Sequence, residues 1–239
     1  MDLIEGIVLK SRPYLDQAKI VFVLTSNGKQ SFILKGGTSL KSHSYSFQQE
    51  LTKIAYATQK NYFKGGKVLA FYPQIRIDMK RLPVALQLVE LADTISDHVS
   101  DTTLFYQFTS DILTLLEQGI DPTLLLIIYQ LKNLYLLGLA PVFHQCVDCK
   151  TKDDLVGFVI TRGGMTCRHC QEAGEAFVPI HVVNDMGRLY ETKLLDMNFS
   201  ELTQSIDKNS LLFVLKQFYE HFLGFKSRVL SIVQQLNIN

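Results

Sequence analysis

The stretch "IVFVLTSNGKQSFILKGG" (residues 20–37) reads as two β-strands joined by a tight turn. Apolar and β-branched residues recur on both sides of the turn, several of them at every second position, which is typical of strands with one buried face. Asn27 and Gly28 stand between the two runs. Asn-Gly is a strong signal for a two-residue β-hairpin because both residues tolerate a positive φ. The sequence therefore predicts a hairpin here.

Similar short segments lie on either side of this hairpin. They are "EGIVLKSR" (5–12), "ELTKIAYATQ" (50–59) and "KVLAFYPQIRI" (67–77), with the glycine pairs 36–37 and 65–66 between segments. Five short antiparallel strands in this length suit a small closed barrel. We predict an OB-fold over residues 1–80, with an SH3-like barrel as the alternative.

After Leu82-Pro83 the apolar period changes to that of an amphipathic helix. Further helices are predicted over residues 102–118, over 121–138, and over 209–236 as one long helix or a pair broken at Gly224. The fold class is therefore α+β, with the barrel followed by an α-helical domain over residues 81–239. The most apolar run, residues 123–140, contains Gln130, Lys132 and Asn133. A bilayer requires about 20 mostly apolar residues, so this run predicts a core helix rather than a membrane span. With no signal-peptide pattern at the N-terminus, we expect a cytoplasmic protein.

Charge is distributed unevenly along the chain. Residues 1–81 contain 13 Lys and Arg against 5 Asp and Glu, whereas residues 82–145 contain one Lys and seven acids. The net charge of +1 hides this asymmetry. A basic segment favours contact with nucleic acid, although a merely solvated basic face is the other interpretation.

All four cysteines lie in "CVDCKTKDDLVGFVITRGGMTCRHC" (146–170) as two Cys-x-x-Cys pairs. This spacing indicates a zinc site, because each pair can present two sulfurs from one tight turn and a hairpin can bring the turns together. We predict that Cys146, Cys149, Cys167 and Cys170 bind one structural Zn²⁺ per chain within an insert over residues 144–177. Nearby basic residues would offset the negative charge of four thiolates: Lys150, Lys152, Arg162 and Arg168.

Other uses of these cysteines fit less well. A thioredoxin-like redox pair requires a parallel α/β setting, which the surrounding sequence lacks. A catalytic zinc usually keeps an open fourth position, and nucleobase deaminases add a His-x-Glu motif that is absent here. His144 and His169 flank the cysteines and remain possible substitutes for one ligand. A metal-dependent hydrolase is therefore the least favoured function.

The sequence contains no recognised catalytic motif and favours a protein that is not an enzyme. It lacks the phosphate-loop spacing, H-E-x-x-H, G-x-S-x-G and a dinucleotide fingerprint. The barrel segment instead combines basic and aromatic residues, as OB-folds do when cations track phosphates and rings stack on bases. The predicted nucleic-acid-binding residues are Lys10, Arg12, Lys35, Lys41, Lys53, Lys60, Lys64, Tyr14, Tyr45, Tyr56 and Tyr62.

The order of these parts resembles the bacterial DNA repair protein RecO family. The opening "GIVLKSRPY" (6–14), the hairpin followed by "LKS" (40–42), "LYLLGLAPVFHQCVDC" (134–149), "GGMTCRHC" (163–170) and "HFLGFKSRVL" (221–230) carry the resemblance along nearly the whole chain. The chain departs from the family in "RPYLDQAKIV", which replaces a Tyr-Gly-Glu-type turn. It also departs in "KGGTSLKS", which keeps Lys35 and Lys41 but lacks further basic residues between them.

The resemblance implies a non-enzymatic, nucleoid-associated protein of recombinational repair. RecO-like proteins bind single- and double-stranded DNA and anneal complementary strands. With RecR and RecF, they place RecA on DNA coated by single-strand-binding protein, whose acidic C-terminal tail they engage. The residues alone leave a second function open, an RNA-binding or ribosome-associated OB-fold protein with a zinc knuckle.

Overall fold

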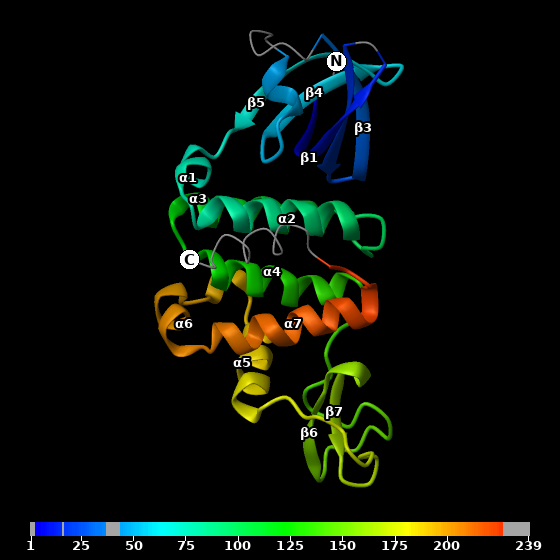
Figure 1. Ribbon diagram of the computed structural model, residues 1–239, viewed down its shortest axis with the longest axis vertical. Coiled ribbons are helices and arrows are strands. Elements are labelled where there is room, and N and C mark those ends of the chain that lie inside the picture. Colours follow the sequence, from blue (N-terminus) through cyan, green and yellow to red (C-terminus); the bar gives the residue numbers. More distant parts are fainter. Residues whose placement is uncertain (1–2, 16, 37–43, 227–239) are drawn as a thin grey trace. The chain divides into compact units, whose positions relative to one another are not determined.

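The computed structural model describes residues 3–15, 17–36 and 44–226. These residues form two compact units, of which the first ends at Pro122 and the second spans Thr123–Lys226. Figure 1 shows the barrel strands in the first unit and the small β6–β7 hairpin in the second.

Five strands in the first unit close into a barrel in the order β1-β2-β3-β5-β4. They are β1 (Ile4–Tyr14), β2 (Ala18–Thr25), β3 (Gly28–Lys35), β4 (Lys53–Gln59) and β5 (Tyr62–Ala70). All neighbours are antiparallel except β3 and β5, which meet in parallel at Ile33 and Tyr62. There the Ile33 amide donates to the Asn61 carbonyl at 2.7 Å. This topology confirms the predicted OB-fold and excludes the SH3-like alternative.

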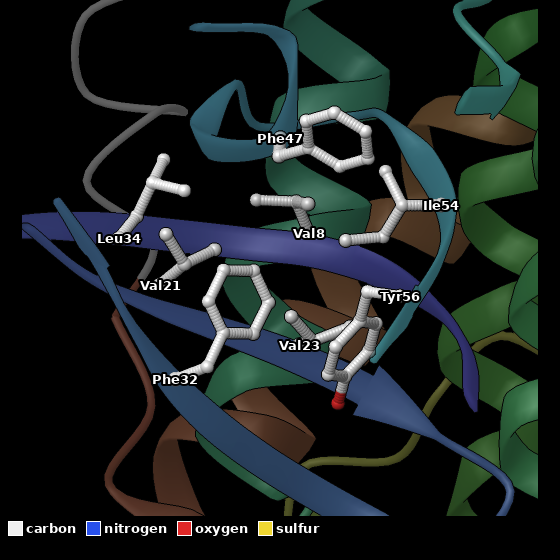
Figure 2. Close-up of a cluster of buried hydrophobic side chains, with 8 residues drawn as sticks. All are labelled: Val8, Val21, Val23, Phe32, Leu34, Phe47, Ile54 and Tyr56. Carbon is white, nitrogen blue, oxygen red and sulfur yellow. The ribbon is translucent and has the colours of Figure 1, made fainter. Parts of the chain in front are cut away.

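The barrel interior is filled by apolar side chains from four strands and from the short 3-10 helix η1 (Tyr45–Gln48). Figure 2 shows them pointing toward one another: Val8, Val21, Val23, Phe32, Leu34, Phe47, Ile54 and Tyr56. The Phe32 and Tyr56 rings lie with centroids 4.8 Å apart and an interplanar angle of 41°, at a separation where aromatic rings attract each other. Burial of this cluster holds the barrel together.

The predicted hairpin is confirmed, and the predicted fifth strand is corrected. The position of the hairpin loop is shifted by one residue: Thr25 pairs with Gly28, so the two loop residues are Ser26 and Asn27 instead of Asn27 and Gly28. Gly28 takes the expected positive φ, 88°, which its lack of a side chain permits, whereas Asn27 does not. The segment expected to be one strand over 67–77 instead ends β5 at Ala70 and forms the helix α1 (Pro73–Ile77). Proline is favoured at the start of a helix, and the Glu117 carboxylate accepts from the α1 amides of Gln74 (3.0 Å) and Ile75 (2.9 Å).

Two longer helices complete the first unit, α2 (Arg81–Ile95) and α3 (Thr102–Gln118). The Asp101 side chain caps α3 by accepting from the Leu104 amide at 2.9 Å, and Gly119 ends it at a φ of 98°. The bounds of α3 match the sequence prediction. Its first residue ties it to the barrel, since the Thr102 hydroxyl donates to the Ser26 carbonyl in the hairpin turn at 2.9 Å.

The second unit contains helices and one small hairpin. Its elements are α4 (Pro122–Leu136), β6 (Leu155–Val159), η2 (Ile160–Arg162), β7 (Gly164–Cys167), α5 (Ile180–Glu191), η3 (Leu194–Asp196), α6 (Phe199–Ser205) and α7 (Lys208–Leu223). The buried Tyr219 hydroxyl donates to the Gln130 carbonyl at 2.8 Å and thereby joins α7 to α4. Gly224 ends α7, and the predicted continuation from residue 227 lies outside the described residues. Within the described ranges, every helix is too short or too polar to cross a bilayer.

Candidate metal centre and nucleic-acid interface

The four cysteine sulfurs of the second unit come together in one cluster. All four lie within 4.8 Å of one another, and Cys149 Sγ and Cys167 Sγ are 3.6 Å apart. Four thiolates at about 2.3 Å from a tetrahedral Zn²⁺ have neighbouring sulfurs about 3.8 Å apart. The cluster thus has the dimensions and the donor set of a closed four-cysteine site, and it can hold a metal ion.

Each cysteine pair sits in a tight turn fixed by backbone hydrogen bonds. In the first turn, the Lys150 amide donates to the Cys146 carbonyl at 3.1 Å, and Lys150 adopts a left-handed φ of 63°. In the second, the Cys170 and Gln171 amides donate to the Cys167 carbonyl at 3.1 and 3.0 Å. The β6–β7 hairpin, which bends at Gly163, brings the two turns together as the spacing predicts.

Burial and hydrogen bonding move the pKa values of two of the thiols in opposite directions. Burial raises the pKa of Cys146, but hydrogen bonds from the backbone N–H groups of Cys149 and Cys167 outweigh this effect and lower it to about 6. The pKa of Cys170 is raised to about 12, chiefly by its hydrogen bond with Cys149. A bound cation would favour the thiolate form of all four cysteines, with release of their protons.

Of the four basic residues expected near the metal, Arg162 makes the contacts. Its guanidinium forms an ion pair with Asp148 and donates to the Cys170 carbonyl at 3.0 Å. Among the described residues, the Lys150 ammonium donates to the Val147 carbonyl and not to the cysteine cluster. Lys152 and Arg168 are exposed, without a side-chain partner among the described residues. Arg162 binds two carboxylates, those of Asp148 and Glu175. The sequence did not indicate this role, because nothing in it distinguishes these two residues from other surface acids.

The flanking histidines do not join the cluster. Among described residues, the group of metal-ligating side chains is Cys146, Cys149, Cys167 and Cys170 alone. His144 instead faces Glu191, with Nε2 and Oε1 2.5 Å apart.

Three barrel lysines point toward the helices of their own unit. Lys10 pairs with Asp93 of α2. Lys29 lies 2.7 Å from Asp97, and its ammonium donates to the Asp93 carbonyl at 2.9 Å. Lys53 donates to the Ser110 hydroxyl of α3 at 2.9 Å. Lys10 and Lys53, both in the predicted nucleic-acid-binding set, are thus engaged within the protein.

A second group of lysines lines an open groove of about 580 Å³ where β3 meets β5. Three exposed cations from the predicted set surround it, Lys35, Lys60 and Lys64, and the described residues along its wall include no carboxylate. Tyr62 contributes an exposed ring, over which the Lys35 ammonium lies 4.7 Å from the centroid. The sequence did not indicate two of the polar lining residues, Ser44 and Gln59.

Lys60 reaches this groove from a two-residue turn. Lys60 and Asn61 join β4 to β5 with φ values of 51° and 65°, so both are in the left-handed region. Two positive φ values at a two-residue hairpin define a type I′ turn, whose twist matches that of the strands. The turn places the Lys60 side chain at the rim of the groove.

The structure corrects the expectation for Tyr56. Its ring lies among the core side chains (Figure 2) with an exposure of 1%. Its hydroxyl donates to Gln30 Oε1 at 3.2 Å. Burial raises its pKa to about 12. A ring with both faces packed cannot stack on a base. Arg12 and Tyr14 are exposed at the end of β1 and Tyr45 is half-buried in η1, while Lys41 lies outside the described residues.

Comparison with known proteins divides the chain after the barrel, at the end of α1. Residues 1–77 match the family described as Recombination protein O N terminal, and residues 76–229 match Recombination protein O C terminal. The chain is similar to the DNA repair protein RecO of Bacillus cereus (strain AH187) and of Bacillus anthracis. Each is 26% identical over 240 residues that cover 98% of this chain and 97% of the relative.

These findings first define a class: an OB-fold barrel joined to a helical body that carries a hairpin with four clustered cysteines able to hold a metal ion. The two family models and the relatives then match almost the full length of the chain, and these matches identify the family. The chain belongs to the RecO family of DNA repair and recombination proteins.

Proposed function

We propose that this protein is a non-enzymatic DNA-binding mediator of recombinational repair, which binds single- and double-stranded DNA and anneals complementary strands. Its nucleic-acid-binding domain would be the barrel of residues 1–80, and the helical domain of residues 81–239 would carry the metal-binding insert of residues 144–177. The observation that supports this most is the groove at β3 and β5, where Lys35, Lys60 and Lys64 gather around the exposed ring of Tyr62.

The groove suggests how annealing proceeds. Lysines that neutralise phosphates lower the repulsion between two strands while their bases search for partners. Binding of this kind releases condensed counterions, so affinity falls as salt rises. For single strands, the slope of log affinity against log salt concentration is about −0.7 for each phosphate contact. Three lysines acting together predict a slope of about −2 from the groove.

Membership of the family supports a proposal for the partners. We propose that the protein acts in the cytoplasm, at the nucleoid, with RecR and RecF. There it would help RecA assemble on DNA coated by single-strand-binding protein, whose C-terminal tail it would contact.

The cysteine cluster would hold one structural Zn²⁺. All four positions of the tetrahedron are supplied by protein sulfurs, which leaves no site for a substrate. The ion would contribute folding free energy to a hairpin too small to build a core. Purified protein should contain one zinc atom per chain by elemental analysis, and a Cys146→Ser variant should contain clearly less.

Strand annealing across a salt series tests the function. We expect the protein to accelerate annealing of two complementary oligonucleotides at low salt and to lose this effect as salt rises. A double variant, Lys35→Glu with Lys64→Glu, should anneal poorly at every salt concentration. The matched control is Lys193→Glu with Lys216→Glu, which makes the same charge change at exposed positions of the second unit.

The two variants separate the outcomes. Loss of annealing in the groove variant with retention in the control supports the proposal. Equal loss in both would mean that net charge, and not the groove, governs binding. No acceleration by the unmodified protein, together with tighter binding to structured RNA than to single-stranded DNA, would contradict the proposal and favour an RNA-binding role.

A further inference from the structure

We propose that Arg162 is the positioning residue of the metal centre: its single side chain ties the two cysteine turns to each other and maintains the geometry of the four sulfurs. The inference rests on the proposed zinc site and concerns a residue that ligates nothing itself.

Arg162 stands at the end of η2, between β6 and β7. Its guanidinium is largely enclosed, with a side-chain exposure of 18%. Nη1 donates to the Cys170 carbonyl at 3.0 Å and to Glu175 Oε1 at 2.9 Å, and Nη2 pairs with the Asp148 carboxylate. A planar guanidinium holds several acceptors at once in fixed directions, which a lysine ammonium does not.

The acceptors belong to different parts of the centre. Asp148 lies inside the first cysteine turn, with its carboxylate 3.7 Å from Cys146 Sγ. The Cys170 carbonyl belongs to the second turn. Glu175 accepts from the Glu172 amide at 3.0 Å and so fixes the loop that follows. One cation therefore spans all three segments.

Electrostatics requires a cation at this place. Four thiolates around a divalent ion leave a net charge of −2, and the Asp148 carboxylate adds to it next to a sulfur. Arg162 lies against that carboxylate and shields it. Removal of Arg162 would leave Asp148 to repel the thiolate of Cys146.

The backbone of the same turn is held from its other side. Gly163 follows Arg162 with a φ of 72°, and a Cβ at Gly163 would stand 3.4 Å from the Phe222 ring and 3.7 Å from the Phe218 ring of α7. The turn thus packs on the aromatic face of α7, which leaves the Arg162 backbone little freedom to shift. A residue fixed in this way can hold the turns in register.

The test uses the full-length, zinc-loaded protein and measures the rate at which zinc passes to a chromophoric chelator. Loss of an outer contact of this kind commonly costs 10–100-fold in metal affinity, so Arg162→Ala should release zinc about 10–100 times faster. Arg162→Lys should fall between it and the unmodified protein. The control is Arg168→Ala, which removes the same side chain from an exposed position beside Cys167 and should change the rate less than twofold.

A second substitution distinguishes a positioning role for Arg162 from a general loss of stability in the cysteine hairpin. Asp148→Asn removes the carboxylate that Arg162 shields, so adding it to Arg162→Ala should slow zinc release again by several-fold. The absorption spectrum of the Co²⁺-substituted protein should retain its thiolate charge-transfer bands in the double variant. If Arg162→Ala does not fold, the release rates of Asp148→Asn, Glu175→Gln and their combination test the same link, and non-additive rates support it.

Two results would overturn the inference. One is release from Arg162→Ala at the rate of Arg168→Ala, and the other is additive rates throughout the Asp148 and Glu175 cycle. Protein that purifies without metal would contradict the zinc site itself, so the two failures can be told apart.

Discussion

The barrel presents lysines in two directions, and the two groups differ in what they face. Lys10, Lys29 and Lys53 meet two carboxylates, one carbonyl and one hydroxyl of α2, α3 and the loop between them, whereas the lysines of the groove meet no carboxylate among its described lining residues. A basic segment is therefore not the same as a basic surface. Part of the excess positive charge in residues 1–81 is balanced inside the first unit by two later acids, Asp93 and Asp97.

Tyrosines follow the same division. Tyr56 lies within the core, and Tyr62 lies at the groove with an exposed fraction of 37%. Residues that point inward should affect stability, and residues at the groove should affect binding.

The largest expected effect is on the core. Tyr56→Ala should lower the free energy of unfolding by about 3–5 kcal/mol, because it removes a fully buried ring and leaves a cavity. Urea denaturation monitored by circular dichroism measures this. Tyr56→Phe is the control and should cost about 1 kcal/mol, the value of its hydrogen bond to Gln30. A loss below 1 kcal/mol for the alanine variant would contradict the placement of Tyr56 in the core.

The next effect concerns the helix-facing lysines. Asp93→Ala should lower the free energy of unfolding by about 2 kcal/mol, since it leaves two largely enclosed ammonium groups without their shared carboxylate. Single-stranded DNA affinity should change less than twofold. The control is Asp111→Ala, an exposed acid on α3 that should leave stability within about 0.5 kcal/mol. A marked gain in DNA affinity for Asp93→Ala would show that the helix-facing lysines also bind DNA, and the division would fail.

A smaller effect is expected at the groove ring. Tyr62→Ala should weaken single-stranded DNA binding by about 1–3 kcal/mol, the value of one base stacked on an aromatic side chain. Fluorescence anisotropy with a labelled oligonucleotide measures the change. Tyr135→Ala removes a tyrosine that is 65% exposed in the second unit and should leave affinity unchanged. Equal losses in both variants would remove the argument for the groove.

The smallest effect is a change in salt dependence. Lys60→Gln should reduce the log–log salt slope of single-stranded DNA binding by about 0.7, because one phosphate contact is lost. Lys29→Gln makes the same chemical change at a helix-facing position and should leave the slope as it is. Titrations at four salt concentrations distinguish the two, and a slope change at Lys29 alone would reverse the assignment of the two groups.

Local patterns were enough to predict much of the fold. The hairpin between β2 and β3, the helix over residues 102–118 and the four-cysteine cluster each depend on residues close in sequence. The hairpin loop was predicted one residue too late. The burial of Tyr56 could also have been found, since it lies two residues after Ile54 and so shares its face of β4.

The partners of the lysines could not be predicted in the same way. Lys10 and Asp93 are 83 positions apart, and Lys53 and Ser110 are 57 apart, so no local pattern connects them. The change from strand to helix at Pro73 depends on Glu117, which lies 42 positions beyond Ile75. Contacts between residues far apart in sequence decide which lysines remain free to bind a ligand. Local sequence patterns do not identify such contacts.

The turn between β4 and β5 has a consequence for protein engineering. A type I′ turn is most stable with Asn-Gly, yet the chain places Lys60-Asn61 there. The left-handed backbone conformation costs roughly 1 kcal/mol for a residue with a side chain such as Lys60. Replacing the pair with Asn-Gly is therefore an obvious step toward a more heat-resistant protein. The same replacement deletes a cation from the groove, so a thermostability screen would select against DNA affinity at this position.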